Sequence, residues 1–475
     1  MNAISTPTLT LWTLAEIAEA TGGTVSGDAT LGVKGVSIDT RSLRHGDLFV
    51  AIIGPNANGH DYVEQAFEAG AAACVVSEDR GWSGPVVSVA DSFLALEDIA
   101  RAARARMHGG IVGVTGSVGK TSTKEMLGHV LSVQAGAAGR VAVTQGNLNN
   151  HWGLPLSLSR MPADTVFGVF EMGMNHAGEI EPLSRMTQPH VALITSVEAV
   201  HIEFFDSIEG IARAKAEIMA GLVEGGTVVL PRDNPHCDLL RELAIKAGVS
   251  NIATFGRSPD ADARLVSLDM SEKGSTVDAE IMGEAVSYAL GVPGEHMVVN
   301  SLGVLAAVSA LGADMKLAAS SLASFSPIAG RGERHEISCA GGTAILIDDA
   351  YNASPASMKA AMQTTALLNA GDGGRRIAVL GDMLELGDEG ERAHADLFDA
   401  IKANGFDRVY AVGSLMASLW SVLPDDLKGV YERDPDKLAA IVAADIHDGD
   451  VVLVKGSKGS LVSRVVQHIL SAKEA

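Results

Sequence analysis

Short apolar runs alternate with longer amphipathic segments along most of this 475-residue chain. A short apolar run predicts a buried strand, and apolar residues three or four positions apart predict a helix covered on one face. From residue 111 onward the two patterns alternate, which predicts an α/β fold with a parallel sheet between helices. The predicted strands here cover 111–114, 166–171, 191–197 and 227–230, and the predicted helices cover 121–133, 208–222 and 295–311.

The patterning also divides the chain into three predicted domains. A helix at 92–107 is followed by paired glycines, which favour a boundary, so we expect a small N-terminal α/β domain at 1–108. A central domain at 109–329 and a Rossmann-like C-terminal domain at 330–475 follow. Between 263 and 290 the pattern becomes strand-like, which predicts an antiparallel edge or insertion. The strands predicted in the outer domains cover 33–38, 47–53, 73–76, 86–89, 344–347, 377–380, 409–412 and 451–454, with a helix at 62–69.

Composition excludes several classes of partner. A net charge of −22 disfavours nucleic acid and anionic membranes, because both are bound through clustered lysine and arginine. The three cysteines lie far apart, and their spacing gives no indication of a disulfide framework or a zinc site. Residues 1–14 lack the pattern of a signal peptide, and no apolar window is long enough for a membrane helix. We therefore expect a cytoplasmic protein without membrane insertion.

The most informative motif is a glycine-rich loop between the predicted strand 111–114 and the predicted helix 121–133. Such a loop turns backbone N–H groups toward a phosphate, the lysine reaches the terminal phosphates, and the threonine hydroxyl suits Mg²⁺. The strict phosphate-loop pattern has a glycine where this chain has Val114, so an ordinary strand-to-helix turn is the alternative. The loop residues are Gly116, Ser117, Val118, Gly119, Lys120, Thr121 and Ser122.

Two residues at neighbouring strand ends could hold a metal ion. Glu171 closes the predicted strand 166–171, and a carboxylate beside a phosphate loop suits Mg²⁺, which prefers oxygen ligands. His201 follows the strand 191–197 in a similar way. The alternative for each is a solvated side chain at the end of a strand.

Lys215 falls on the apolar stripe of the predicted helix 208–222. Burial favours the neutral form of lysine, and a neutral amine can react with CO₂ to give a carbamate that could bridge two metal ions. The alternative is a lysine whose stem packs while its head group reaches water.

Further candidates for ligand binding lie in loops and at helix starts. Short amides at Asn149 and Asn150 suit ligand hydrogen bonds or simple turns, and His296 and Asn300 would face the same way on one helix. Arg331 could clamp a phosphate or lie exposed. The acidic Asp349, the aromatic Tyr351 and the amide Asn352 follow the predicted strand 344–347. The carboxyl end of a strand is where α/β sheets bind ligands.

Taken together, these motifs resemble the Mur ligases of peptidoglycan synthesis over nearly the whole chain. The resemblance rests on the following segments: Ser37–Arg41, Gly46–Phe49, Gly116–Thr121, Gly146–Asn150, Glu171–His176, Ala214–Ile218, Gly294–His296, Asp349–Asn352, Gly381–Met383 and Lys455–Ser457. It implies three domains with a central ATP-binding sheet, hinges near 108–110 and 328–330, and an ATP-dependent C–N ligase. Separately, we expect the chain to be a monomer. Within the family, the run Gly381–Gly387 favours members that add D-Ala-D-Ala to UDP-N-acetylmuramoyl-tripeptide through an acyl phosphate.

The resemblance also implies a role for each candidate residue. The phosphate loop, His296, Asn300, Arg331 and Asp349 would bind ATP. Thr121 and Glu171 would hold one Mg²⁺ ion, and His201 with carbamylated Lys215 a second, with Lys120, Lys215 and His201 as catalytic residues. The UDP-sugar and peptide substrates would meet Ser37, Asp39, Thr40, Arg41, Asn149, Asn150, Tyr351 and Asn352.

Three alternatives stay open. A sister ligase that adds a single amino acid is one, although the Asp233–Asn234–Pro235 segment that resembles its substrate motif lies in the central domain and ends in His236 rather than arginine. An amide ligase similar to folylpolyglutamate synthase shares the loop and the lysine, and a nucleotide-binding regulator without catalysis is the third. In the nucleotide site, Met297 stands where the family often has asparagine. The sequence does not determine the third residue of the tripeptide substrate.

Overall fold

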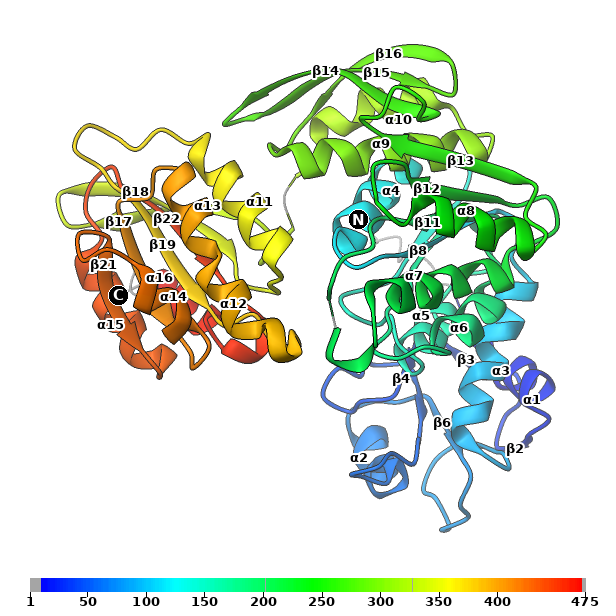
Figure 1. The fold of residues 1–475 in the computed structure, drawn as a ribbon. Coiled ribbons are helices and arrows are strands. Elements are labelled where there is room, and N and C mark those ends of the chain that lie inside the picture. Colours follow the sequence, from blue (N-terminus) through cyan, green and yellow to red (C-terminus); the bar gives the residue numbers. More distant parts are fainter. Residues whose placement is uncertain (1–9, 201, 327, 472–475) are drawn as a thin grey trace, which may run out of the picture.

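The computed structural model describes residues 10–200, 202–326 and 328–471, which form three sheets with helices along the chain (Figure 1). The three sheets follow one another in sequence. A two-stranded ribbon of β1 (Trp12–Thr13) and β3 (Gly32–Val33) lies near the start of the described chain, with the first strand of the first sheet between its two strands in sequence. The part with the last sheet lies beside the central part, as the yellow-to-red and green ribbons in Figure 1 show. The α/β fold class predicted from the patterning is confirmed.

The first sheet has the strand order β2-β7-β6-β5-β4, parallel except for β2. The predicted strand 33–38 divides in two, because Val33 pairs with Trp12 in the ribbon while Val36 pairs with Leu48 in the sheet. The strands are β2 (Thr24–Ser26), β4 (Val36–Ser37), β5 (Leu48–Val50), β6 (Ala73–Val76) and β7 (Val86–Ser88), and the helices are α1 (Leu14–Thr21), η1 (Gly59–Tyr62), α2 (Val63–Glu68) and α3 (Ser92–Ala105).

The central sheet has nine strands in the order β16-β15-β14-β13-β12-β11-β8-β10-β9. From β9 to β14 neighbouring strands pair in parallel, which agrees with the alternation of strands and helices in the sequence. The strands are β8 (Gly110–Thr115), β9 (Arg140–Val143), β10 (Thr165–Glu171), β11 (Val191–Ile194), β12 (Thr227–Pro231), β13 (Asn251–Gly256), β14 (Ala263–Ser271), β15 (Gly274–Ile281) and β16 (Glu284–Leu290). The antiparallel edge predicted between 263 and 290 is confirmed as β14, β15 and β16.

Helices cover both faces of the central sheet and form two cores. Residues of α4, α9 and α10 pack on one face. The other face packs against α5, α6, α7 and α8, and that core continues without interruption through α3 into the first sheet. The predicted boundary at residue 108 therefore stays a prediction. The helices are α4 (Lys120–Ala135), α5 (Gly153–Ser159), α6 (Ile180–Thr187), η2 (Ile202–Phe204), α7 (Ile208–Ala216), η3 (Glu217–Gly221), α8 (Cys237–Lys246), α9 (Glu295–Ala310), α10 (Met315–Ser321) and η4 (Leu322–Ser324).

The predicted helix 208–222 changes form midway, because α7 ends at Ala216 and a 3-10 helix, η3, follows. Close packing against α6 explains the tighter turn: a Cβ on Gly221 would lie 2.0 Å from the backbone oxygen of Ser184. Glu217 at the start of η3 accepts hydrogen bonds from the backbone N–H groups of Gly178 and Ile180. The first turn of α6 thereby gains a carboxylate partner.

The third sheet has the order β17-β18-β22-β19-β20-β21, with β17 antiparallel at its edge and the other strands parallel. Separate apolar cores fill its two faces. The strands are β17 (Glu333–Cys339), β18 (Gly342–Asp349), β19 (Arg376–Gly381), β20 (Arg408–Val412), β21 (Lys428–Glu432) and β22 (Val451–Lys455), and the helices are α11 (Pro355–Ala366), η5 (Gly387–Glu389), α12 (Gly390–Ala395), α13 (Leu397–Ala403), α14 (Met416–Val422), α15 (Pro435–Asp445), η6 (Lys458–Ser460) and α16 (Ser463–Ser471).

A buried ion pair connects the strands of this third sheet. The side chain of Asp450, 1% exposed, lies 2.7 Å from the Arg375 guanidinium and accepts hydrogen bonds from the backbone N–H groups of Arg375 and His447. Burial alone raises the pKa of Asp450, but the hydrogen bonds from Arg375 and from the two amides outweigh it and hold the pKa below its ordinary value. This carboxylate fixes the start of β22 beside the start of β19.

We expect Asp450→Asn to destabilise the protein by about 1–3 kcal/mol at pH 7, because charge-assisted hydrogen bonds are lost. A carboxyl with a lowered pKa stabilises the fold above its unfolded-state pKa of about 4, and this contribution disappears as the pH falls through the lower folded-state pKa. Urea denaturation at pH 7 and at about pH 3 should therefore show the variant approaching wild type in acid. Asp425→Asn, at a 99% exposed side chain, is the control. An equal loss at both pH values would contradict the assignment.

Candidate active site

The candidate site lies at the carboxyl ends of β8, β10 and β11, which are neighbours in the central sheet. Parallel register aligns Glu171 with Val114 and Ile194 with Thr115, so the residues after each strand meet at one edge. This edge is where open α/β sheets bind ligands. The loop from β8 into α4 starts here.

Close contact with β11 determines the shape of the loop. Gly116 has a φ of +147°, and a Cβ on it would lie 1.9 Å from Thr195 Oγ1, so only glycine fits. The N–H of Ser117 donates to the backbone oxygen of Ser196 at 2.9 Å, and the N–H of Val118 donates to Ser196 Oγ at 2.9 Å. Ser117 and Val118 are thus held by the neighbouring strand end, and the loop has a fixed conformation.

Lys120 begins α4 and folds back over the loop. Its Nζ donates to the backbone oxygens of Gly116 at 2.7 Å and Ser117 at 3.3 Å. Burial lowers the pKa of Lys120 and the charge of Arg331 adds to this, while Glu171 opposes it. An anionic ligand beside Lys120 would stabilise the charged form of its amine. The N-terminus of α4 adds backbone N–H groups that favour a phosphate at the same place.

Glu171 lies at the centre of a polar cluster at the end of β10. It is 2% exposed, and its Oε2 accepts from Thr121 Oγ1 at 3.0 Å while its Oε1 accepts from Asn149 Nδ2 at 2.8 Å. Its backbone N–H donates to Thr144 Oγ1 at 3.1 Å. A buried carboxylate beside a hydroxyl offers the hard oxygen ligands that Mg²⁺ prefers. The donor set therefore fits such an ion next to the phosphate loop.

Lys215 lies in the interior on α7. Its side chain is 3% exposed, so the alternative of a head group in water is wrong. Burial, together with the charge of Lys120, lowers the pKa of Lys215 well below its ordinary value. Both effects favour the neutral form of the amine, which is the nucleophilic form. His201, the other predicted ligand, lies outside the described residues.

The third sheet contributes charged groups to the same region. Lys455 Nζ, on a 3% exposed side chain, pairs with Asp349 Oδ2 at 2.8 Å, and the Arg331 guanidinium lies over the Tyr351 ring at 4.4 Å. Both charges of the Asp349 and Lys455 pair act on His296 of α9. A Cβ on Gly294, just before α9, would lie 2.9 Å from Thr364 Oγ1 of α11. The central and third sheets therefore meet at the candidate nucleotide site.

The remaining predicted residues have different surroundings. Asn300 is 9% exposed and packs on the loop, since a Cβ on Gly119 would lie 2.9 Å from its Nδ2. Asn150 accepts from the N–H groups of Trp152 and Gly153, which caps α5, and the exposed Asn352 accepts through its side chain from the N–H of Ala353. Ser122 lies in the first turn of α4.

The residues predicted to meet the UDP-sugar form a turn after β4. Ser37 Oγ donates to the backbone oxygen of Asp39 at 3.0 Å, and Arg41, 88% exposed, pairs with Asp39 at 2.6 Å. The hydrogen bond from Arg41 holds the pKa of Asp39 below its ordinary value. Thr40, in the same turn, is half-buried. Arg160, near the end of α5, donates to the backbone oxygen of Val36, which fastens this region to the central part.

Sequence reasoning missed several supporting residues. The hydroxyl groups of Ser196 and Thr195 form hydrogen bonds with the backbone of Val118 in the loop. The hydroxyl of Thr144 accepts from the backbone N–H of Glu171. Thr195 and Ser196 fall within the predicted strand 191–197, which in the structure ends at Ile194, and no strand was predicted before Thr144, so the sequence pattern gave no signal for these residues. Lys455 followed a predicted strand, but its pairing with Asp349 depends on the order of strands in the third sheet.

Comparisons with known families agree with this architecture. Residues 32–108 match the model for the Mur ligase family catalytic domain, residues 114–308 the Mur ligase middle domain, and residues 330–458 the Mur ligase glutamate ligase domain. The chain belongs to the Mur ligase family, a class of α/β ligases with this three-part fold.

Curated relatives point to one member of the class. A protein of Bacillus subtilis (strain 168) is 37% identical, with 97% of this chain and 98% of the relative covered, and one of Escherichia coli (strain K12) is 33% identical, with 96% and 98% covered. Both are named UDP-N-acetylmuramoyl-tripeptide--D-alanyl-D-alanine ligase.

Solved structures agree. MurF from Acinetobacter baumannii superimposes with a TM-score of 0.83 at 27% identity, covering 97% of this chain and 99% of that one. MurF ligase from Thermotoga maritima, solved in complex with ADP, gives 0.75 at 28% identity, covering 93% and 98%. None of the helices in the described ranges is long and apolar enough to cross a membrane.

We expect Gly116→Ala to lower the free energy of unfolding by about 2 kcal/mol or more and to weaken nucleotide binding, because the methyl group collides with Thr195 Oγ1. Thermal denaturation and calorimetric titration with ADP measure the two effects. Gly210→Ala is the control, since a Cβ there would have ordinary contacts of 3.4 Å or more. Wild-type stability in Gly116→Ala would show that the loop is not constrained as described.

Proposed function

We propose that this chain ligates D-alanyl-D-alanine to UDP-N-acetylmuramoyl-tripeptide with hydrolysis of ATP to ADP and phosphate. The name borne by the B. subtilis relative, 37% identical over nearly the full length, is the observation that carries the proposal. The geometry supports it, because a constrained phosphate loop, a buried carboxylate and a buried lysine converge at the ends of β8, β10 and α7.

The proposed chemistry has two steps. A carboxylate oxygen of the tripeptide attacks the γ-phosphorus of ATP, and ADP leaves. The amine of D-Ala-D-Ala then attacks the acyl carbon, phosphate leaves, and the amine proton passes to solvent or to a basic group. Lys120 would exchange its bonds to Gly116 and Ser117 for phosphate oxygens and stabilise the charge on the transferred group, together with the N–H groups of α4.

The donors around Glu171 support the first of two proposed metal sites, and the second rests on the family resemblance. Thr121 and Glu171 would hold one Mg²⁺ ion, and His201 with the carbamate of Lys215 a second; when bound, the ions neutralise phosphate charge and orient the reacting oxygens. The neutral amine of Lys215 adds to CO₂ and releases one proton, which converts a buried group with a lowered pKa into an anion. The change places a negative charge near Lys120 and supplies an oxygen ligand.

The other predicted residues would recognise the substrates. Arg331, Asp349, His296 and Asn300 would contact ATP, supported by the charges that act between the third sheet and α9. The turn after β4 would receive the UDP-sugar. Asn149, Asn150, Tyr351 and Asn352 would receive the peptide. We propose that the enzyme works as a monomer in the cytoplasm, where its three free cysteines stay reduced.

A substrate-mixing assay tests the function. With ATP, Mg²⁺, bicarbonate and UDP-N-acetylmuramoyl-tripeptide, we expect phosphate release to depend on D-Ala-D-Ala and to remain at background with glutamate or single amino acids. Tripeptides with different third residues reveal which one is accepted. Turnover with a single amino acid in place of the dipeptide would instead identify a sister ligase.

We expect Lys215→Ala to lower kcat by at least about 100-fold, with partial recovery in millimolar short-chain carboxylic acids that replace the carbamate. Removal of bicarbonate should lower wild-type activity, and [¹³C]bicarbonate should give a carbamate NMR signal that is absent from the variant. Lys246→Ala, on the exposed side of α8, is the matched lysine control. Full activity of Lys215→Ala would refute the carbamate.

A further inference from the structure

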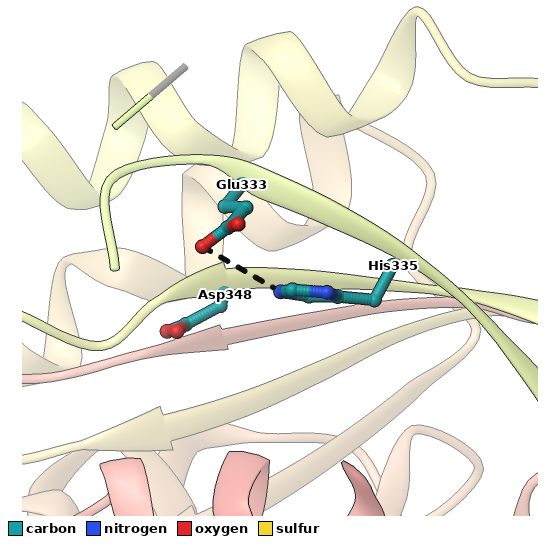
Figure 2. Close-up of side chains that lie close together, drawn as sticks. All are labelled: Glu333, His335 and Asp348. Carbon is teal, nitrogen blue, oxygen red and sulfur yellow. Dashed lines mark ion pairs between the residues drawn. The ribbon is translucent and has the colours of Figure 1, made fainter. Parts of the chain in front are cut away.

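Three side chains of different chemistry gather where β17 pairs with β18. The antiparallel register places Glu333 opposite Asp348 and His335 opposite Leu346, so Glu333, His335 and Asp348 share one face of the sheet. Figure 2 shows them together, with the contact between Glu333 and His335 dashed. One ligand atom from each lies within 4.8 Å of the others. None of the three residues belongs to the proposed ligase site.

The polar atoms of this cluster are incompletely satisfied. The Nε2 atom of His335 is buried and has no hydrogen-bond partner in the described part of the chain. Its neighbour, Glu333 Oε2, lies 3.7 Å away, which exceeds hydrogen-bond distance. A buried ring nitrogen without a partner is costly in a protein interior. The imidazole therefore has an unpartnered ring nitrogen beside the Glu333 carboxylate that is available to coordinate an ion.

The cluster also carries an excess of negative charge. Burial raises the pKa of Asp348, and the neighbouring charges of Asp349 and Glu333 raise it further against one backbone hydrogen bond and the effect of His335. Asp348 Oδ1 accepts from the N–H of Ala350, which leaves its other oxygen available.

Nearby cationic side chains are engaged elsewhere. Arg331 lies over the Tyr351 ring, Arg334 donates to the backbone oxygen of Glu272, and Lys455 pairs with Asp349. These three cations therefore do not neutralise Glu333 or Asp348, which lie close to His335. A positive ion would neutralise them.

We propose that Glu333, His335 and Asp348 form a binding site for a divalent transition-metal ion of the zinc class. One imidazole nitrogen with two carboxylate oxygens suits Zn²⁺ or Co²⁺, whereas Mg²⁺ prefers oxygen alone. Ligands of one such ion, at about 2.0–2.2 Å, lie at most about 4.4 Å apart, so side-chain shifts of a few tenths of an ångström would close the site. Water would fill the remaining positions.

The position of the site in the fold suggests what the ion does. Glu333 and His335 come directly after Gly330 and Gly332, which have φ values of +70° and +80° in the connection to the third sheet. Asp348 precedes Asp349, the partner of Lys455. The ion would fasten the first residues after this connection to the strand that bears Asp349. This role does not depend on the proposed ligase activity.

The test uses the full chain after chelation and desalting, without nucleotide. We expect titration with Zn²⁺, and with Co²⁺ followed by its visible absorption, to show a saturable site that is weakened at least about tenfold in His335→Gln and Glu333→Gln. Zn²⁺ should also raise the thermal midpoint of wild type and leave that of His335→Gln unchanged. Circular dichroism establishes that each variant is folded.

Glu336→Gln, on the adjacent position of β17, and His468→Gln, on α16, are the matched controls and should bind as wild type does. Loss of binding in these controls, an equal affinity in His335→Gln, or no saturable binding to wild type would each overturn the proposal. If the wild type shows no saturable binding, the contact between His335 and Glu333 is an ion pair without a metal ion. Ligase activity is not part of this readout, so its absence would bear only on the proposed function.

Discussion

The close approach of Gly116 to Thr195 is the constraint on which the candidate site depends. A methyl group at position 116 has no room beside the Thr195 hydroxyl, so the chain must turn where β8 ends. That turn directs Ser117 and Val118 to partners on Ser196 and starts α4 at Lys120. Because α4 also holds Thr121 beside Glu171, one glycine contact determines the positions of the lysine, the helix N-terminus and the metal ligands together.

Electrostatics explain why this site favours anions within an acidic protein. The chain carries a net charge of −22, yet the charge of Arg331 lowers the pKa of Lys120 against the effect of Glu171, and the charge of Lys120 lowers the pKa of Lys215. Burial makes a positive charge on Lys120 or Lys215 costly; a triphosphate would neutralise Lys120, and a carbamate would replace the amine of Lys215 by an anion. Ligand binding and stability of the site are therefore coupled, because the same anions that react also relieve the repulsion.

Local patterns were enough to predict the loop and Glu171 at the end of its strand, because each depends on residues close in sequence. The pattern placed Lys215 on an apolar stripe but left open whether its head group reaches water, and the structure shows it buried. Features that need the three-dimensional arrangement could not be predicted. The helix at 208–222 changes form because Gly221 packs on Ser184, and the strand at 33–38 divides because Val33 has a different partner from Val36. The Glu333, His335 and Asp348 cluster depends on strand register, which the sequence does not show. The roles of the site residues stay predictions.

The distribution of apolar cores bears on how such a site can open and close. One continuous core joins the first sheet, α3 and the face of the central sheet that packs against α5, α6, α7 and α8, whereas the third sheet has cores of its own. Movement of the first sheet against the central sheet would break their shared core and expose apolar surface to water. Movement of the third sheet would leave its own cores intact. We therefore expect the turn after β4 and the phosphate loop to stay fixed relative to each other. Arg331, Asp349 and Lys455 would then be the groups that approach and withdraw, and the glycine-rich connection before β17 has the conformational freedom to allow it.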